Sequence, residues 1–294
     1  MTDYSLHKIS HLISSNMMHE SSKQKLEQDI KLYISNIYDK FKLTKNLLYR
    51  NEPVDFFVNY IPLGLKAKNN FLRLKDPIEI LNNFNKIAIL GNAGSGKTTL
   101  LKYVTLNCIK REDLIPIYIE MRIFVSQHLC FENFVANIIS QEFSDEIKGI
   151  LKQGNFLFVL DGFDEINYME GWIANQIQNF ISNFNLNIFI ITSRPGTNIE
   201  SLNEFHIYEV APLSDNDILV YVEQLHLSNY KKGMFYESIE NDSYFHQYLT
   251  TPLLLSIYID YIVNHNDLNI PKKKTIFFRN IVDTLFSKHD AVSK

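Results

Sequence analysis

Cysteine is scarce in this sequence. Only Cys108 and Cys130 occur in 294 residues. Two cysteines cannot form the disulfide framework that holds many small secreted domains together, and their spacing matches no metal-binding motif. We therefore expect two buried thiols in a reducing compartment.

Long apolar runs are also missing. The nearest one, Leu253 to Val263, is shorter than a membrane span and is interrupted by Asp260. The first ten residues, MTDYSLHKIS, lack the charged and then apolar layout of a signal peptide. Together these absences predict a cytoplasmic protein with no membrane partner.

There is no excess of positive charge either. The formal net charge is −4, which excludes a bulk attraction to nucleic acid or to anionic membranes, so we expect no direct nucleic-acid partner. What the sequence does contain is apolar material, at 46% of residues with 21 Phe and 16 Tyr. A chain of this length and composition can bury one large core or two modest ones.

The stretch 86–100, KIAILGNAGSGKTTL, joins an apolar run to a loop of the pattern G-x-x-x-x-G-K-T. Glycine lets the backbone curl around an anion with several N–H groups pointing inward, and the following helix adds the positive end of its dipole. Lys97 would reach the β- and γ-phosphates, and Thr98 would hold Mg²⁺ through its hydroxyl. The residues expected to bind the nucleotide are Gly91, Asn92, Ala93, Gly94, Ser95, Gly96, Lys97, Thr98 and Thr99.

Short apolar runs alternate with helical patterns from Ile87 onward. Such alternation is typical of a parallel sheet with crossover helices, because strands buried on both faces are continuously apolar. The sequence therefore predicts an α/β fold of the P-loop NTPase type, with a parallel five-stranded sheet flanked by helices. The five predicted strands are 87–90, 115–119, 156–160, 188–192 and 207–210.

A second motif, FLFVLDGFDE, covers residues 156–165. An apolar strand that ends in Asp161 presents its carboxylate at the carboxyl edge of the sheet, where parallel sheets collect their ligands. Asp161 would then bind Mg²⁺ through a water. Asp164 and Glu165 supply further carboxylates that could orient and deprotonate an attacking water. An acidic turn without such a role is the alternative.

A third motif, IFIITSRPG at 188–196, delivers Arg194 to the same edge. A cation there can stabilise charge on the γ-phosphate, although Arg194 could instead form a structural ion pair. No N-K-x-D sequence is present to recognise guanine, which favours ATP over GTP.

Residues 1–50 have a helical pattern, with apolar residues at intervals of three and four positions between Leu26 and Phe41. Such a stripe serves either packing or a partner. Residues 51–84 are a linker or lead-in, in which Tyr60 or Ile61 either covers the nucleotide base or simply packs. Helices are expected at 215–225, 244–249, 253–263 and 275–286.

The combination of GNAGSGKTTL, LDGFDE, ITSRPG, APLSDNDILVYVEQL and TTPLLLSIYI resembles the NACHT family of STAND nucleotide-binding ATPases. The resemblance implies a switch that holds ADP when closed, slowly hydrolyses ATP, and self-associates when ATP-bound and triggered, as in bacterial anti-phage proteins. It also implies a sensor or effector partner. Pro252 would pack near the adenine, although Thr250 stands where the family usually has glycine.

The resemblance divides the chain into a helical segment (1–50), a lead-in (51–84), a NACHT nucleotide-binding domain (85–214) and a helical lid (215–294). Family members continue into winged-helix and sensor regions, so we expect either a truncated form or a minimal switch. Two other functions stay open. One is a continuously cycling ATPase motor or loader acting on nucleic acid or protein, and the other is a scaffold that retains nucleotide without hydrolysing it.

Overall fold

The computed structural model describes residues 9–11, 20–44, 53–67, 70–73, 77–140, 145–166, 171–197, 199, 204–240, 249–264 and 279. Contacts divide the chain into two compact units. Unit 1 comprises Met1–Lys42, Gly64–Ala93 and Lys97–Val210, and unit 2 comprises Leu43–Leu63, Gly94–Gly96 and Ala211–Lys294. The helices expected at 244–249 and 275–286 lie outside the described residues, apart from Leu249 and Arg279.

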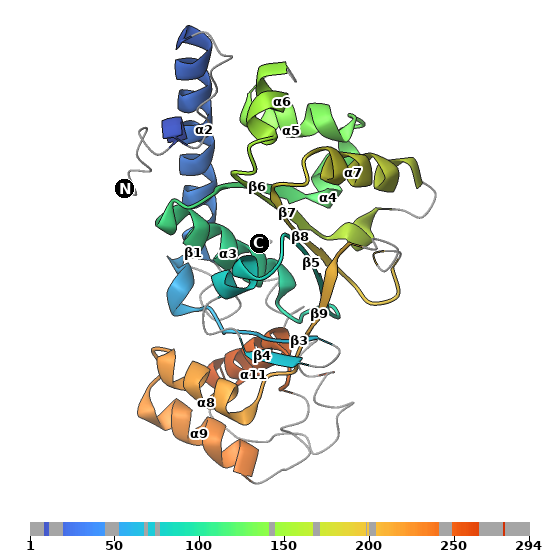
Figure 1. The fold of residues 1–294 in the computed structure, drawn as a ribbon. Coiled ribbons are helices and arrows are strands. Elements are labelled where there is room, and N and C mark those ends of the chain that lie inside the picture. Colours follow the sequence, from blue (N-terminus) through green and yellow to red (C-terminus); the bar gives the residue numbers. More distant parts are fainter. Residues whose placement is uncertain are drawn as a thin grey trace. The chain divides into compact units, whose positions relative to one another are not determined.

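Unit 1 is built on a seven-stranded sheet of order β4-β3-β9-β5-β8-β7-β6. The five strands from β9 to β6 are parallel and lie side by side (Figure 1), which confirms the predicted α/β fold. They are β9 (His206–Val210), β5 (Lys86–Leu90), β8 (Ile188–Ser193), β7 (Phe156–Asp161) and β6 (Ile115–Glu120).

Two further strands extend this sheet beyond β9. They are β3 (Gly64–Ala67), which pairs antiparallel with β9, and β4 (Asn70–Arg73), which pairs antiparallel with β3. The sequence predicts a linker or lead-in over residues 51–84, because Pro62 and Gly64 punctuate its extended stretches. The sheet is therefore larger than predicted by one antiparallel hairpin.

Helices cover both faces of the sheet in unit 1 (Figure 1). One face carries α2 (Glu20–Phe41) and α3 (Lys97–Arg111), and the other carries α5 (Phe131–Ile139) and α7 (Gly171–Asn183). The remaining elements are shorter: η2 (Pro77–Asn82), α4 (Met121–Ser126), α6 (Asp145–Leu151) and η3 (Phe163–Glu165).

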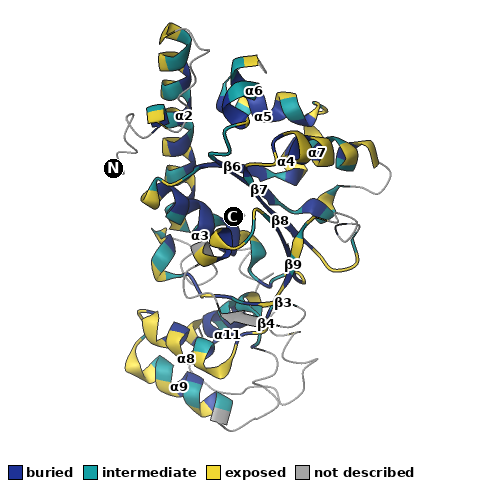
Figure 2. Cartoon of the chain, viewed as in Figure 1, coloured by how far each residue is buried: buried dark blue, intermediate teal, exposed yellow. Residues whose placement is uncertain are grey.

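The core of unit 1 lies between these layers, and the four central strands β5, β6, β7 and β8 are buried along almost their whole length (Figure 2). Phe158 of β7 stacks on Phe189 of β8 with ring centroids 5.1 Å apart, and Phe180 of α7 meets Phe158 edge-on at 5.2 Å. Offset-stacked and edge-to-face pairs are the favoured aromatic geometries. This packing holds β7 and β8 in register up to the edge where Asp161 and Ser193 end them.

Helix α2 buries the apolar stripe that its sequence predicts. The hydroxyl of Tyr33 in this helix also accepts a hydrogen bond from the backbone N–H of Tyr118 in β6. The helix ends at Phe41 and strand β1 (Leu43–Thr44) follows, so the prediction of helix is wrong at these two residues. The reason is a tertiary one, since β1 pairs with β2 (Val54–Asp55). Residues 1–8, 12–19 and 45–50 lie outside the described part of the chain.

Unit 2 contains η1 (Phe56–Val58) and three described helices, α8 (Asp215–Gln224), α9 (Asn229–Glu240) and α11 (Pro252–Asn264). Ser214 caps α8 in a capping box with Asp217, as its sequence indicates. Helix α9 was not predicted, because its apolar residues do not form one continuous face and Gly233 interrupts it. It packs on α11, where the rings of Phe235 and Tyr258 lie 5.8 Å apart.

The two cysteines have different environments. Cys108 is buried in α3, where its thiol donates to the carbonyl of Leu114 and burial raises its pKa to about 12, so it is an unreactive thiol. Cys130 is exposed just before α5, so the expectation that it is buried is wrong. Cys130 precedes the first turn of α5, so the apolar periodicity of that helix does not indicate whether its side chain is buried.

None of the helices within the described residues combines the length and the apolar character that a membrane span requires.

Candidate functional site

The phosphate loop joins β5 to α3 and is held in place by the neighbouring strand. The Gly91 N–H donates to the Ser193 carbonyl at 3.1 Å, which ties the start of the loop to the end of β8. Gly94 and Gly96 have φ values of +76° and +91°, in the left-handed region that favours glycine. Lys97 and Thr98 then begin α3. The G-x-x-x-x-G-K-T pattern thus forms the strand, loop and helix that it predicts.

The tip of the loop, Gly94–Gly96, groups with unit 2 and contacts the first turn of α11 there. The Leu253 N–H donates to the Gly94 carbonyl at 3.3 Å. A Cβ atom on Gly94 would lie 2.8 Å from Leu253, and one on Gly96 would lie 3.0 Å from Leu63 and 3.3 Å from Pro252. Pro252 therefore lies against the phosphate loop, while its contact with adenine stays a prediction.

Lys97 turns its ammonium back onto the loop. Its Nζ donates to the carbonyls of Gly91 at 2.5 Å and Asn92 at 3.2 Å. Burial lowers the pKa of Lys97 below the ordinary lysine value. The carboxylates of Asp164 and Asp161 oppose this shift, and the Arg194 guanidinium adds to it. These four charged groups are therefore close enough to interact, as the three motifs predict.

Asp161 accepts hydrogen bonds from three hydroxyl groups. Its Oδ1 accepts from Thr98 at 3.2 Å and from Thr192 at 2.7 Å. Its Oδ2 accepts from Tyr118 at 2.8 Å. The Thr192 hydroxyl in turn accepts from the Gly162 N–H at 3.0 Å. The predicted metal-binding pair, Thr98 and Asp161, is thus already in contact.

Asp164 and Arg194 form a pair with two contacts. The Arg194 backbone N–H donates to Asp164 Oδ1 at 3.1 Å, and the guanidinium Nε lies 3.0 Å from Oδ2. The Arg194 side chain is 62% exposed, whereas that of Asp164 is 14% exposed. The ion pair that was the alternative role for Arg194 is present, and its partner, Asp164, is another of the three residues predicted to be catalytic.

Glu165 is the more exposed carboxylate of the acidic pair. Its backbone N–H donates to the Gly162 carbonyl at 2.9 Å in a single turn of 3₁₀ helix. Gly162 has a φ of +82°, and a Cβ atom there would lie 3.3 Å from the Glu165 carboxyl carbon. Glycine at 162 therefore permits both the left-handed turn and the close approach of Glu165.

The residues present fit a magnesium–nucleotide complex. Thr98 and Asp161 offer the hydroxyl and carboxylate oxygens that Mg²⁺ prefers. The Ser95 hydroxyl, at the loop tip in unit 2, is buried and has no hydrogen-bond partner among the described residues. Asn92, Ala93 and Thr99 are exposed at the same loop. Tyr60 and Ile61 are buried in unit 2, and their role at the base stays a prediction.

Two residues of the site were missed by sequence analysis, Tyr118 and Thr192. Both lie within apolar strands, where tyrosine and threonine are common and do not by themselves indicate a site. Thr192 lies two positions before Arg194, so its closeness to the site could have been inferred from the third motif. Nothing in the sequence around Tyr118 indicates its bond to Asp161.

Residues 85–229 match the family model of the NACHT domain. The chain contains a NACHT domain. Its phosphate loop and paired Thr98 and Asp161 lie inside the matched segment, so this NACHT domain is a P-loop NTPase module.

Among solved structures, the chain is similar to DnaA from Aquifex aeolicus bound to AMPPCP, with 18% identity and a TM-score of 0.46 over 67% of this chain and 62% of that one. It is also similar to the replication initiator DnaA bound to AMPPCP and single-stranded DNA, with 17% identity and a TM-score of 0.45 over 76% and 66%. The chain thus spans less than two thirds of either protein. At these TM-scores the similarity decides nothing about function. No curated protein sequence matches the chain.

Proposed function

We propose that this protein is an ATP- and ADP-controlled STAND switch that binds ATP with Mg²⁺, hydrolyses it slowly and oligomerises on activation. One observation carries the proposal. Thr98 donates to Asp161 at 3.2 Å and Arg194 pairs with Asp164 at 3.0 Å, at the edge of the sheet where the phosphate loop leads into Lys97 of α3. Such a cluster of two cations and two carboxylates beside a phosphate loop fits the binding and cleavage of a nucleoside triphosphate.

Each residue has a distinct task in this proposal. The loop N–H groups and the Lys97 ammonium bind the phosphate oxygens, while Thr98 and Asp161 hold Mg²⁺, which neutralises phosphate charge when bound. Glu165 orients the attacking water, because its carboxylate is exposed whereas Asp164 is engaged by Arg194. Arg194 stabilises the charge that develops on the γ-phosphate once it leaves Asp164.

The contact between Asp164 and Arg194 supports slow turnover. Arg194 is held by two contacts to a carboxylate that is largely buried, so reaching a phosphate requires the loss of the guanidinium contact. An arginine that must first leave Asp164 suits a switch that hydrolyses ATP rarely. The resemblance to NACHT proteins further supports roles in bacterial anti-phage defence, in the cytoplasm, with a sensor or effector protein as partner.

The test uses the full chain as purified. The bound nucleotide is identified, and the mass in solution and the hydrolysis rate are measured with and without Mg²⁺ and ATP. The switch predicts retained ADP or ATP, a larger assembly with ATP, and turnover far below the roughly 1 to 1,000 per second of typical enzymes. Turnover within that range and stimulated by DNA would establish a cycling motor or loader instead. Persistence of intact ATP over days would indicate a nonhydrolysing scaffold.

A further inference from the structure

Tyr118 connects the metal-binding carboxylate to a helix far from it in the sequence. The Tyr118 hydroxyl donates to Asp161 Oδ2 at 2.8 Å. The backbone N–H of the same residue donates to the Tyr33 hydroxyl of α2 at 2.8 Å. A short path of two hydrogen bonds therefore runs from α2 through β6 to Asp161.

The geometry of the sheet explains why Tyr118 can reach Asp161. In the parallel pair of β6 and β7, Tyr118 lies opposite Val159 and Glu120 lies opposite Asp161. Side chains alternate between faces along a strand, so these four side chains share one face of the sheet. A tyrosine two positions before the end of β6 is long enough to place its hydroxyl beside the last carboxylate of β7.

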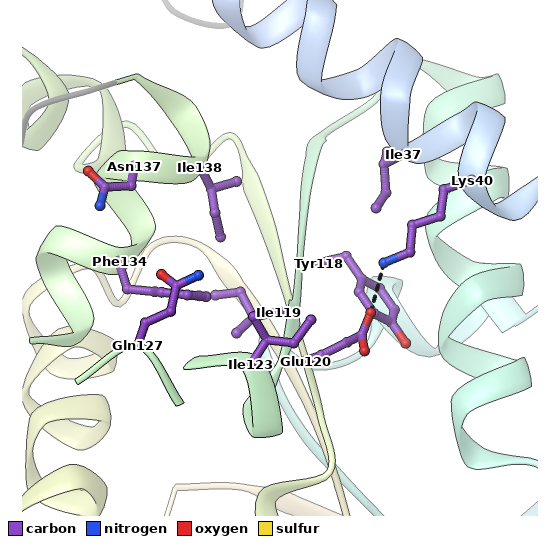
Figure 3. A pocket seen from close by; sticks show the side chains of 10 residues that line it. All are labelled: Ile37, Lys40, Tyr118, Ile119, Glu120, Ile123, Gln127, Phe134, Asn137 and Ile138. Atoms are coloured by element: carbon purple, nitrogen blue, oxygen red, sulfur yellow. Dashed lines mark hydrogen bonds and ion pairs between the residues drawn. The ribbon is translucent and has the colours of Figure 1, made fainter. Parts of the chain in front are cut away.

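The ring of Tyr118 is fixed by its surroundings. Phe41 of α2 meets it edge-on with ring centroids 4.8 Å apart. Figure 3 shows Tyr118 beneath α2, beside Ile37 and Lys40, where it lines a pocket of about 250 Å³ and where Lys40 pairs with Glu120 at 2.8 Å. Tyr118 is itself buried, and burial together with the negative charge of Asp161 raises its pKa, so its hydroxyl stays protonated and remains a donor.

The hydrogen bonds on Asp161 leave one of its acceptor positions without a donor among the three hydroxyls that contact it. A carboxylate offers about four acceptor positions on its two oxygens. Thr98 and Thr192 occupy two of them on Oδ1, and Tyr118 occupies one on Oδ2. The remaining position is on Oδ2, whose direction is set by the Tyr118 hydroxyl. Partners of this kind orient the group that binds the metal and are worth roughly 10- to 100-fold in metal affinity.

We infer that Tyr118 is a positioning residue for the Mg²⁺-binding carboxylate of Asp161. We also infer that Tyr33, which accepts from the Tyr118 N–H, couples the position of α2 to this carboxylate. The inference rests on the proposed binding of ATP with Mg²⁺. It predicts that the affinity for Mg²⁺ responds to changes at Tyr118 and Tyr33, whereas binding of the nucleotide without metal does not.

The experiment compares Tyr118→Phe with the wild-type full chain. The substitution keeps the ring against Phe41 and removes the hydroxyl. Fluorescent ATP is titrated in EDTA and at increasing Mg²⁺, and thermal melting is recorded. We expect the Mg²⁺ concentration that gives half of its maximal effect on ATP binding to rise roughly tenfold. The affinity for ATP in EDTA should stay unchanged. Tyr33→Phe should shift it less in the same direction, while Tyr38→Phe on the same helix should not shift it.

The possible outcomes separate this inference from the proposed function. An unchanged Mg²⁺ requirement in Tyr118→Phe, beside a normal wild-type response, would overturn the positioning role alone. Equal losses with and without Mg²⁺ would show that the hydroxyl serves the fold and would also overturn it. Failure of the wild-type chain to bind ATP would instead overturn the proposed function.

Discussion

The Arg194 guanidinium lies 3.0 Å from the Asp164 carboxylate, and the Arg194 backbone N–H donates to the same carboxylate at 3.1 Å. A residue that follows β8 is thereby paired with one that follows β7. The pair holds the Arg194 guanidinium at the edge of the sheet. A cation there is suited to stabilising the charge of a phosphoryl group during its transfer. Two of the residues predicted to be catalytic are therefore in contact with each other.

Removal of Arg194 should slow hydrolysis without loosening the fold. We expect Arg194→Ala to lower ATP turnover by at least about tenfold, since it removes a cation that stabilises developing charge. Because the side chain is 62% exposed, the pair should contribute no more than about 1 kcal/mol to the free energy of unfolding. Single-turnover hydrolysis and thermal melting measure the two effects. Arg122→Ala, which removes an arginine 3.7 Å from Glu120, is the matched control. Unchanged turnover would leave Arg194 with a structural role only.

Replacing Asp164 or Glu165 by the corresponding amide should lower ATP turnover for different reasons. Glu165→Gln should keep ATP binding and lower turnover roughly 100-fold, because it removes the exposed carboxylate that we propose orients the attacking water. Asp164→Asn should act through Arg194, whose guanidinium it no longer holds as an ion pair. Turnover and nucleotide affinity are measured for both variants. A larger loss of turnover in Asp164→Asn than in Glu165→Gln would assign the water to Asp164.

The half-buried charge of Lys97 should make ATP binding depend on pH. Burial lowers the pKa of Lys97, so its ammonium is lost at a lower pH than that of an ordinary lysine, about 10.4. Affinity for ATP should therefore fall as pH rises through this lowered pKa. Titrations at increasing alkaline pH measure the decline, and Lys97→Met should bind weakly at every pH.

The same shift has the opposite sign for stability without nucleotide. Between the lowered pKa of the folded chain and the ordinary pKa of the unfolded chain, the unfolded state binds more protons, so this residue makes stability rise with pH. Lys97→Met should lose ATP binding without a lower melting temperature, and it should lose this contribution to the pH dependence. A strongly destabilised Lys97→Met would contradict the desolvation cost inferred for the ammonium.

The tip of the phosphate loop should not tolerate a side chain at Gly94. Its φ of +76° is unfavourable for alanine, and the new Cβ would lie 2.8 Å from Leu253. We expect Gly94→Ala to lower the free energy of unfolding by about 1 to 3 kcal/mol and to weaken ATP binding. Urea unfolding measures the first effect. Gly233→Ala in α9 is the control, because a Cβ atom there meets nothing within 4 Å and alanine favours a helix.

Asn187 should be important for the stability of unit 1. Its side chain is fully buried, accepts from the Phe156 N–H at 3.0 Å, and donates to the carbonyls of Leu151 at 2.6 Å and Phe184 at 2.9 Å. Asn187→Ala leaves these backbone groups buried without this partner and should lower the free energy of unfolding by about 3 kcal/mol. Urea unfolding of this variant and of Asn185→Ala, an exposed neighbour, tests the expectation. Similar midpoints for the two variants would contradict it.

Prediction from the sequence succeeded where the pattern is local. The five parallel strands were found because buried strands are continuously apolar, and the phosphate loop because its glycines, Lys97 and Thr98 are adjacent in the chain. Prediction failed where a long-range contact decides the outcome. The pairing of β3 with β9 made a sheet edge out of an expected linker, and the pairing of β1 with β2 ended the predicted N-terminal helix early.

The sequence by itself determined the chemistry of the site, since the residue types that bind phosphate and Mg²⁺ stand next to one another in three short motifs. Only the tertiary structure decided how those residues are held. Arg194 pairs with Asp164, and Tyr118 with Asp161, across neighbouring strands whose order no local pattern specifies. The physical reason is that hydrogen bonds and ion pairs act over a few ångströms in space, whatever the separation of their partners along the chain.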